Sequence, residues 1–236
     1  MRTVVLVPFR GDGGWRDRAF EHVHRHLQQL PFELVVGDSG DVPFSFGRTF
    51  NQLADRPWDV AVLHDADSIV PLENIVAAVE QAGPGITYPW NRLIGLTRQA
   101  SKVWFRTGQI PDSGFRRQRP PGRIPQGGPR VVTRDLWETV KGFDPRFVGW
   151  GGEDDVFARC AEILVAGPKR LDGTLVELWH PKQENNPDDP YYRARERNRR
   201  MAMEVRRMNP DELRAYVEQR WRVWGAGGFG QWERRR

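Results

Sequence analysis

The sequence predicts an α/β fold with a mostly parallel central sheet, flanking helices and a helical extension at the C-terminus. Three observations predict it. The first 90 residues alternate short apolar runs with amphipathic segments, in the order expected of successive βαβ units. Polar residues stand directly after several of the apolar runs. After His180 only helical spacing remains, with helix-start signals at Pro190 and Pro210.

The expected elements follow one another with clear starts and stops. Residues 3–8 form a continuous β-branched run, typical of a strand buried on both faces. Residues 15–30 place apolar side chains at helical spacing before Pro31. Further strands are expected over 32–38, 58–67, 85–90, 130–133 and 173–180, and further helices over 47–55, 73–82, 133–142, 153–166, 190–208 and 210–224. The segment 107–130 is rich in Pro, Gly and Arg, which predicts a long functional or mobile loop.

Composition excludes several classes of protein. A hydrophobic content of 39% with 11% aromatic residues indicates a globular chain. No apolar stretch approaches the roughly 18 residues that a membrane span needs. The N-terminal apolar run is too short for a signal peptide, so we expect a cytoplasmic protein. The single cysteine, Cys160, excludes an internal disulfide and a multi-cysteine metal site.

The charge balance favours anionic partners. The net charge is +5 and the pI is near 9.8, and only 4 of the 36 basic residues are lysine. Arginine clusters lie at 116–123, at 193–200 and at the C-terminus. Guanidinium groups bind phosphates and carboxylates well, although a solvated surface in an arginine-rich protein is the alternative.

Acidic residues end the third expected strand, in the sequence Asp65-Ala66-Asp67. Two acids spaced in this way can reach one hard cation, and open α/β sheets bind ligands at the carboxyl ends of their strands. Arg10 and Asp38 follow the first two strands and would share that edge, and His180 follows a later strand and offers an imidazole for Mn²⁺ or Zn²⁺. The alternatives are turn or cap residues for the acids and a buried hydrogen-bonding role for the histidine.

The stretch FVGWGGEDDVFAR, residues 147–159, carries the strongest signal. Glycines at 149, 151 and 152 let the backbone approach a ligand closely, and Trp150 offers a flat apolar face for a sugar ring. Three acids then begin a helix. A helix dipole favours acids at this position by about 0.3–1 kcal/mol each, so a stabilised helix start is the alternative reading.

The order of these motifs resembles the β-1,4-galactosyltransferase family and its chondroitin-synthase relatives. The resemblance spans roughly residues 3–190 and rests on VPFR, FGRTFNQLA, the D-x-D strand, the block GGPRVVTRDLWETVKGFDPRFVGWGGEDDVFARC, and the final H…NNP. It implies a Rossmann-like glycosyltransferase A fold over 1–188, with a nucleotide-sugar half over about 1–90 and an acceptor half over about 91–188, followed by the helical extension 189–236. Polypeptide N-acetylgalactosaminyltransferases share Trp-Gly-Gly-Glu but typically continue with Asn, so Asp154 favours the inverting galactosyltransferase side.

The resemblance also implies roles for individual residues. It implies a Mn²⁺ or Mg²⁺ cofactor and a UDP-sugar donor, with Asp154 as the general base. The implied metal ligands are Asp65, Asp67 and His180. The nucleotide-sugar residues are Pro8, Arg10, Asp38, Arg48, Asp65 and Trp150, and the acceptor residues are Trp150, Gly151, Gly152 and Glu153. The basic loop at 107–130, by its charge, adds Arg116 and Arg117 to the expected acceptor residues. The family often has a methionine ligand three residues before the histidine. Here that residue is Glu177, which leaves the third protein ligand open.

The expected activity is transfer of a hexose from a UDP-sugar to an acceptor hydroxyl, with Asp154 taking the proton. The basic loop and the high pI indicate a polyanionic acceptor, and one candidate is a hydroxymethylated pyrimidine in DNA, flipped from the stack. A glycan or glycolipid acceptor is the alternative. Two further classes stay open: a non-catalytic nucleic-acid-binding protein, which would release no UDP, and a metal-dependent nuclease, which would need no nucleotide sugar.

Overall fold

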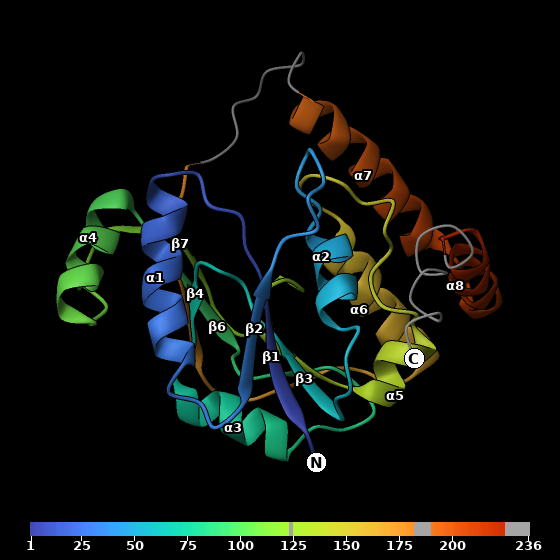
Figure 1. Ribbon diagram of the computed structural model, residues 1–236, viewed down its shortest axis with the longest axis horizontal. Coiled ribbons are helices and arrows are strands. Elements are labelled where there is room, and N and C mark those ends of the chain that lie inside the picture. The colour runs from blue at the N-terminus through green and yellow to red at the C-terminus, as the bar shows by residue number, and fades with distance from the viewer. Residues whose placement is uncertain (123–124, 182–189, 225–236) are drawn as a thin grey trace.

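The computed structural model describes residues 1–122, 125–181 and 190–224 (Figure 1). Strands are β1 (Thr3–Pro8), β2 (Glu33–Gly37), β3 (Val60–Leu63), β4 (Ser68–Ile69), β5 (Thr87–Tyr88), β6 (Arg92–Leu96), β7 (Phe115–Arg119), β8 (Arg130–Thr133), β9 (Lys169–Arg170) and β10 (Thr174–Glu177). Helices are α1 (Trp15–Leu27), α2 (Phe46–Leu53), α3 (Leu72–Glu80), α4 (Arg98–Thr107), α5 (Arg134–Thr139), α6 (Glu153–Leu164), α7 (Pro190–Arg207) and α8 (Pro210–Trp224).

The central sheet has the strand order β2-β1-β3-β8-β5-β9. Strand β1 pairs in parallel with both β2 and β3, whereas β8 is antiparallel to its neighbours. Every side chain of β1 is buried, because helices cover both faces: α1 and α3 lie on one side of the sheet, and α2, α5 and α6 on the other (Figure 1). The predicted α/β fold with a mostly parallel central sheet is confirmed.

A second sheet, in the order β4-β10-β6-β7, was not expected. It places β7 inside the segment 107–130, so the expectation of an irregular loop over that whole segment is wrong. The sequence of β7, FRRQR, has no apolar alternation, since β7 is a mostly exposed edge strand that, among the described residues, pairs only with β6. The second sheet matters for the site because β4 and β10 pair with Glu177 opposite Ser68.

The helical extension packs against the rest of the chain. Helix α7 lies along α6 (Figure 1), and Val205, Leu213 and Val217 are buried in the common core. The predicted domain boundary at 188/189, like the C-terminal arginine cluster, lies outside the described residues. Within the described ranges, no helix combines the length and the apolar character that a membrane crossing requires.

Candidate active site

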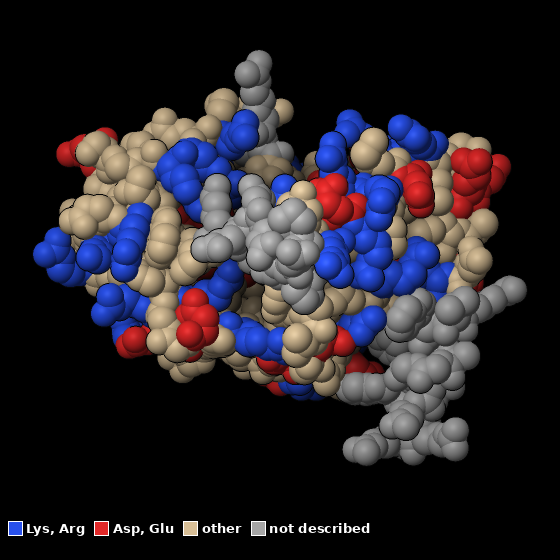
Figure 2. Space-filling view, turned by 90° about the horizontal axis from the view of Figure 1, so that it is seen from above, with Lys and Arg blue, Asp and Glu red and all other residues tan. Residues whose placement is uncertain are grey.

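The carboxyl ends of the parallel strands carry the predicted polar residues. Pro8 ends β1 and Arg10 follows it, Asp38 follows β2, and Asp65 lies two residues beyond β3. Because β1 is parallel to both neighbours, these positions share one edge of the sheet, as the sequence predicted. Figure 2 looks onto this end of the molecule and shows Lys and Arg side chains gathered on either side of its centre.

Charged residues predicted for nucleotide-sugar binding form one connected network. Arg10 binds both carboxylate oxygens of Asp38, with Nε–Oδ2 and Nη2–Oδ1 distances of 2.6 Å. Arg10 also donates to the Asp41 carbonyl at 2.6 Å, and Arg48 donates to Asp41 Oδ1 at 2.6 Å. The hydrogen bonds from Arg10 hold the pKa of Asp38 below its ordinary value. Asp41 thus connects residues predicted for nucleotide-sugar binding. It lies in a turn-rich segment that carries no local signal for this role.

A cluster of possible metal ligands lies where the two sheets meet. Ligand atoms of Asp67, Glu177 and His180 all lie within 4.8 Å of one another, and His180 Nε2 is 3.3 Å from Asp67 Oδ2. The antiparallel pairing of β4 and β10 brings them together, since the Leu178 amide donates to the Asp67 carbonyl at 2.8 Å. Two carboxylates and an imidazole suit a divalent cation such as Mn²⁺. Asp65 lies outside this trio.

Glu177 is shared with the arginines of β7. Arg116 and Arg117 contact its two carboxylate oxygens, at 3.1 and 2.5 Å. The sequence predicted that both arginines contact the acceptor, whereas the structure brings them to the cluster of possible metal ligands. Their positive charges offset the negative charge of Glu177, so a cation bound here would share this carboxylate with the two arginines.

Asp65 links this cluster to the start of α6. Burial, followed by the negative charges of Asp154 and Asp67, raises the pKa of Asp65 well above its ordinary value. Carboxylates from the segment between β3 and β4 and from the start of α6 therefore lie close together. Such a surplus of negative charge favours the binding of a cation there.

Helix α6 begins with the three predicted acids, and Gly152 precedes them with a φ of 93°. Glu153 is only 6% exposed, and its Oε2 has no hydrogen-bond partner among the described residues. Burial and the neighbouring Asp154 carboxylate raise the pKa of Glu153 to about 8, so its carboxyl group is largely protonated at neutral pH. A protonated Glu153 can donate a hydrogen bond to a substrate oxygen.

Asp154 forms an ion pair that sequence reasoning missed. Its Oδ1 accepts a hydrogen bond from Arg130 at 2.5 Å, while a quarter of the Asp154 side chain stays exposed. Arg130 is 1% exposed, donates to the Gln126 carbonyl at 2.9 Å, and lies against the rings of Phe143 and Phe157. Burial disfavours its charge, but Asp154, together with Tyr88 and Asp65, outweighs burial and raises the pKa of Arg130. The available signal was an arginine opening an apolar strand, because such a residue requires a buried partner.

The Gly-Trp-Gly-Gly segment is held by its backbone. The Gly149 amide donates to the Phe44 carbonyl at 2.9 Å, and Asn198 of α7 donates to the Val148 carbonyl at 3.0 Å. A Cβ atom on Gly152 would lie 3.0 Å from Ala202 Cβ, so α7 can approach only because this residue is glycine. With the backbone fixed, the Trp150 side chain is 67% exposed and faces solvent.

Known proteins resemble this chain in sequence and in fold. Residues 113–170 match the family model described as the N-terminal domain of galactosyltransferase. The chain is 25% identical to human β-1,4-galactosyltransferase 3 over 204 residues, which is 80% of this chain and 46% of that protein. The chain thus spans about half the length of the curated relatives that it matches.

Solved structures show the same fold at low identity. The catalytic domain of Drosophila β1,4-galactosyltransferase 7, in complex with xylobiose, superposes with a TM-score of 0.53 at 16% identity, covering 88% of this chain and 82% of that one. S. aureus TarS 1–349 in complex with UDP gives a TM-score of 0.51 at 11% identity, covering 97% and 74%. The chain therefore has the glycosyltransferase A fold, and the predicted resemblance to the β-1,4-galactosyltransferases is confirmed.

Proposed function

We propose that this protein is a metal-dependent, inverting glycosyltransferase that moves a hexose from a UDP-sugar to an acceptor hydroxyl. One observation carries the proposal: a divalent-cation ligand set and a partly exposed, arginine-bound carboxylate flank the same partly buried acid, Asp65. A cation can stabilise the departing diphosphate, and a carboxylate can remove the proton from the acceptor hydroxyl. Both groups must lie near the bond that reacts.

The relatives support the donor and the cofactor. The names of the curated matches are β-1,4-galactosyltransferases. GalNAc-T7, solved with UDP, GalNAc and Mn²⁺, superposes with a TM-score of 0.53 at 12% identity. A UDP-sugar donor with Mn²⁺ or Mg²⁺ is therefore the combination to test first.

The metal would be held by Asp67 and His180, with Glu177 as the third protein ligand that the sequence left open. When bound, the ion supplies Lewis-acid stabilisation of the diphosphate as it departs. Arg116 and Arg117 would then lie beside the same diphosphate, through their shared contact with Glu177. We assign them to the donor rather than to the acceptor.

The transfer step uses the α6 acids. The acceptor oxygen forms a bond to the anomeric carbon from the face opposite UDP, the bond from that carbon to the diphosphate oxygen breaks, and its electron pair leaves with UDP. Asp154 takes the acceptor proton on Oδ2 while Arg130 holds Oδ1. Glu153 donates a hydrogen bond that orients the acceptor, and Trp150 covers the sugar ring.

The nature of the acceptor is a separate proposal from the transfer reaction. The basic surface of Figure 2 favours an anionic acceptor, and the two sequence-level candidates, hydroxymethylated DNA and a glycan, both carry hydroxyls that Asp154 could deprotonate. The names of the relatives and structures given above mention no nucleic acid.

UDP release from UDP-galactose, UDP-glucose and the N-acetyl sugars, measured with and without Mn²⁺, tests the activity. We expect Mn²⁺-dependent release in the wild type and a loss of at least about 10²-fold in Asp67→Asn and His180→Ala. Asp55→Asn, an exposed acid outside the site, serves as the control and should match the wild type. No Mn²⁺-dependent release with any of the four donors would exclude the proposed function.

A further inference from the structure

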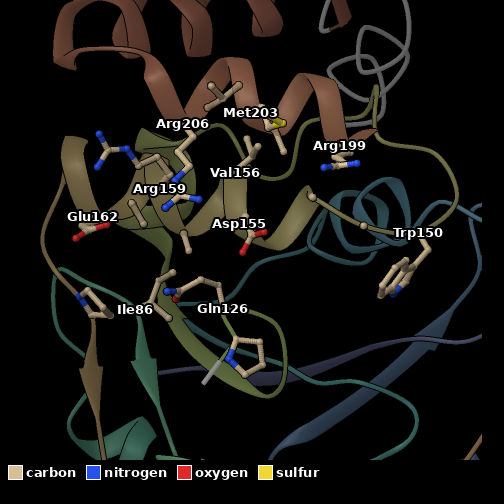
Figure 3. Close-up of a pocket in the computed structure, with 18 of the residues that line it drawn as sticks. Ile86, Gln126, Trp150, Asp155, Val156, Arg159, Glu162, Arg199, Met203 and Arg206 are labelled. Atoms are coloured by element: carbon tan, nitrogen blue, oxygen red, sulfur yellow. The ribbon is translucent and has the colours of Figure 1, made fainter. Parts of the chain in front are cut away.

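A groove of about 900 Å³ runs from the Gly-Trp-Gly-Gly segment along α6 and α7. Trp150, Gly151 and Gly152 line one end of it, next to the catalytic acids, and Gln126 lines its wall below α6 (Figure 3). The groove therefore ends at the glycines that directly precede Glu153 and Asp154 in the chain. Its size suits a chain of a few sugar rings, since ligand pockets span about 300–1,000 Å³.

Arginines from two helices face this groove. Arg159 comes from α6, and Arg199 and Arg206 come from α7, so the side chains approach from two walls (Figure 3). None of the three forms an ion pair with a carboxylate of the described residues, and the buried Nε of Arg159 has no hydrogen-bond partner among them. By contrast, Arg10, Arg48, Arg116 and Arg117 are each paired with a carboxylate.

Two carboxylates alternate with these arginines. Asp155 lies centrally, between Arg159 and Arg199 in Figure 3, and Glu162 lies one helical turn or more further along α6. Burial and the Asp154 charge raise the pKa of Asp155, while Arg206 opposes that rise. The groove therefore offers both cationic donors and carboxylate acceptors, together with apolar surface from Val156 and Met203.

This mixture fits an acidic saccharide better than a nucleic acid. Sugar hydroxyls can donate hydrogen bonds to Asp155 and Glu162, and the anionic substituents can accept hydrogen bonds from the guanidinium groups. A ring face can stack on Trp150. A phosphodiester backbone would place a charge at every unit against the two carboxylates. Single-stranded nucleic acid is also usually bound on successive aromatic side chains, and this groove has one.

We propose that the α6–α7 groove binds an acidic oligosaccharide acceptor, with Arg159, Arg199 and Arg206 contacting its carboxylates and Trp150 stacking on a sugar ring near the accepting hydroxyl. This rests on the proposed function, because it names the acceptor of the same site. It also gives the helical extension a direct role in substrate binding.

The test measures binding without a donor. A tetrasaccharide of alternating uronic acid and hexosamine, its carboxyl-reduced counterpart and a single-stranded DNA tetranucleotide are titrated into the full chain by calorimetry. The double variant Arg199→Ala/Arg206→Ala should bind the acidic tetrasaccharide at least 10-fold more weakly than the wild type. Arg207→Ala/Arg214→Ala removes the same charge from exposed positions outside the groove and should stay within 2-fold. The carboxyl-reduced sugar should bind the wild type at least 10-fold more weakly.

Several results would overturn the proposal: no binding of the acidic sugar to the wild type, equal weakening in both double variants, or equal affinity for the carboxyl-reduced sugar. Tighter binding of the tetranucleotide, lost in Arg199→Ala/Arg206→Ala alone, would identify a nucleic-acid groove instead. Thermal unfolding of both double variants checks that they fold. Donor hydrolysis by the wild type is measured separately, so a failure of the proposed function and a failure of this groove give different results.

Discussion

Two groups of charged side chains on the same edge of the sheet differ in how their charges are balanced. In the predicted nucleotide-sugar group, Arg10 and Arg48 each have a carboxylate partner, and both arginines contact Asp41. At the start of α6, buried Glu153 leaves an oxygen without a partner, and Asp154 depends on a single arginine. The first group is complete in the free protein. The second is incomplete: a buried carboxyl oxygen of Glu153 lacks a partner, and Glu153 and Asp154 disfavour one another's negative charge, so a cation, a proton or a substrate can stabilise this group.

Breaking the acidic group should have the largest effect on activity. Asp154→Asn keeps an oxygen for Arg130 but cannot take a proton, so we expect transfer to fall by about 10²–10⁴-fold. Affinity for the UDP-sugar should change by less than about 2-fold. Single-turnover UDP release in the presence of acceptor measures the first quantity, and donor titration measures the second. Asp155→Asn is the matched control, and an equal loss in that variant would contradict the assignment of the base.

Removing the buried partner should have the largest effect on stability. Arg130→Met leaves Asp154 without its cation in a partly buried site, so the free energy of unfolding should drop by about 3 kcal/mol. Arg92→Met removes an exposed pair with Asp172 and should cost less than about 1 kcal/mol. Urea unfolding measures both. Equal losses of unfolding free energy in the two variants would contradict the expectation that the buried pair contributes more than the exposed one.

The raised pKa of Glu153 predicts that folding stability changes with pH in the wild type but not, through this group, in Glu153→Gln. Between the ordinary value of 4.5 and about 8, the folded protein holds a proton on Glu153 that the unfolded chain releases. Folding stability from this group is therefore present at low pH and declines as pH rises through that window. Glu153→Gln removes the decline, so its stability advantage should grow by roughly 1–3 kcal/mol from pH 5 to pH 8. Parallel stability curves for variant and wild type would contradict this.

The balanced network should respond least. Arg10→Ala breaks a pair whose side chains are 29% and 32% exposed, so unfolding should change by less than about 1 kcal/mol. UDP affinity should still weaken by about 10-fold if Arg10 contacts the nucleotide. Arg2→Ala, which breaks the exposed pair with Glu33, should match the stability change and leave UDP affinity unaltered. Unchanged UDP affinity in Arg10→Ala would remove this group from the donor site.

Local patterns predicted the strand ends and the helix starts, because those signals lie within a few residues. Thr133 caps α5 through its side chain, and Asn209 and Glu212 cap α8 reciprocally, as expected. The ion pairs were not predictable: Arg130 meets Asp154 across 24 residues of chain, and Arg116 meets Glu177 only because β7 joins the second sheet. Strand β7 lacks apolar alternation, so nothing local identified it.

One missed helix did carry a local signal. Helix α4 begins after Thr97, whose hydroxyl accepts from the Ala100 amide, and ends at Gly108 in the left-handed conformation. A threonine cap and a closing glycine frame that segment in the sequence, so the helix could have been predicted. Its neighbour β6 is short and partly exposed, and that strand could not have been placed without its partners.

The buried amide of Asn198 has a consequence for shortening the chain. Asn198 is fully buried in α7 and donates to the carbonyls of Val148 and Trp150, at 3.0 and 3.4 Å. A chain shortened to end before α7 would therefore lose two hydrogen bonds to the backbone at Val148 and Trp150. It would still contain the predicted catalytic residue Asp154 and the neighbouring acids. Such a shortened chain would retain the full set of acids and yet lose the geometry in which they work.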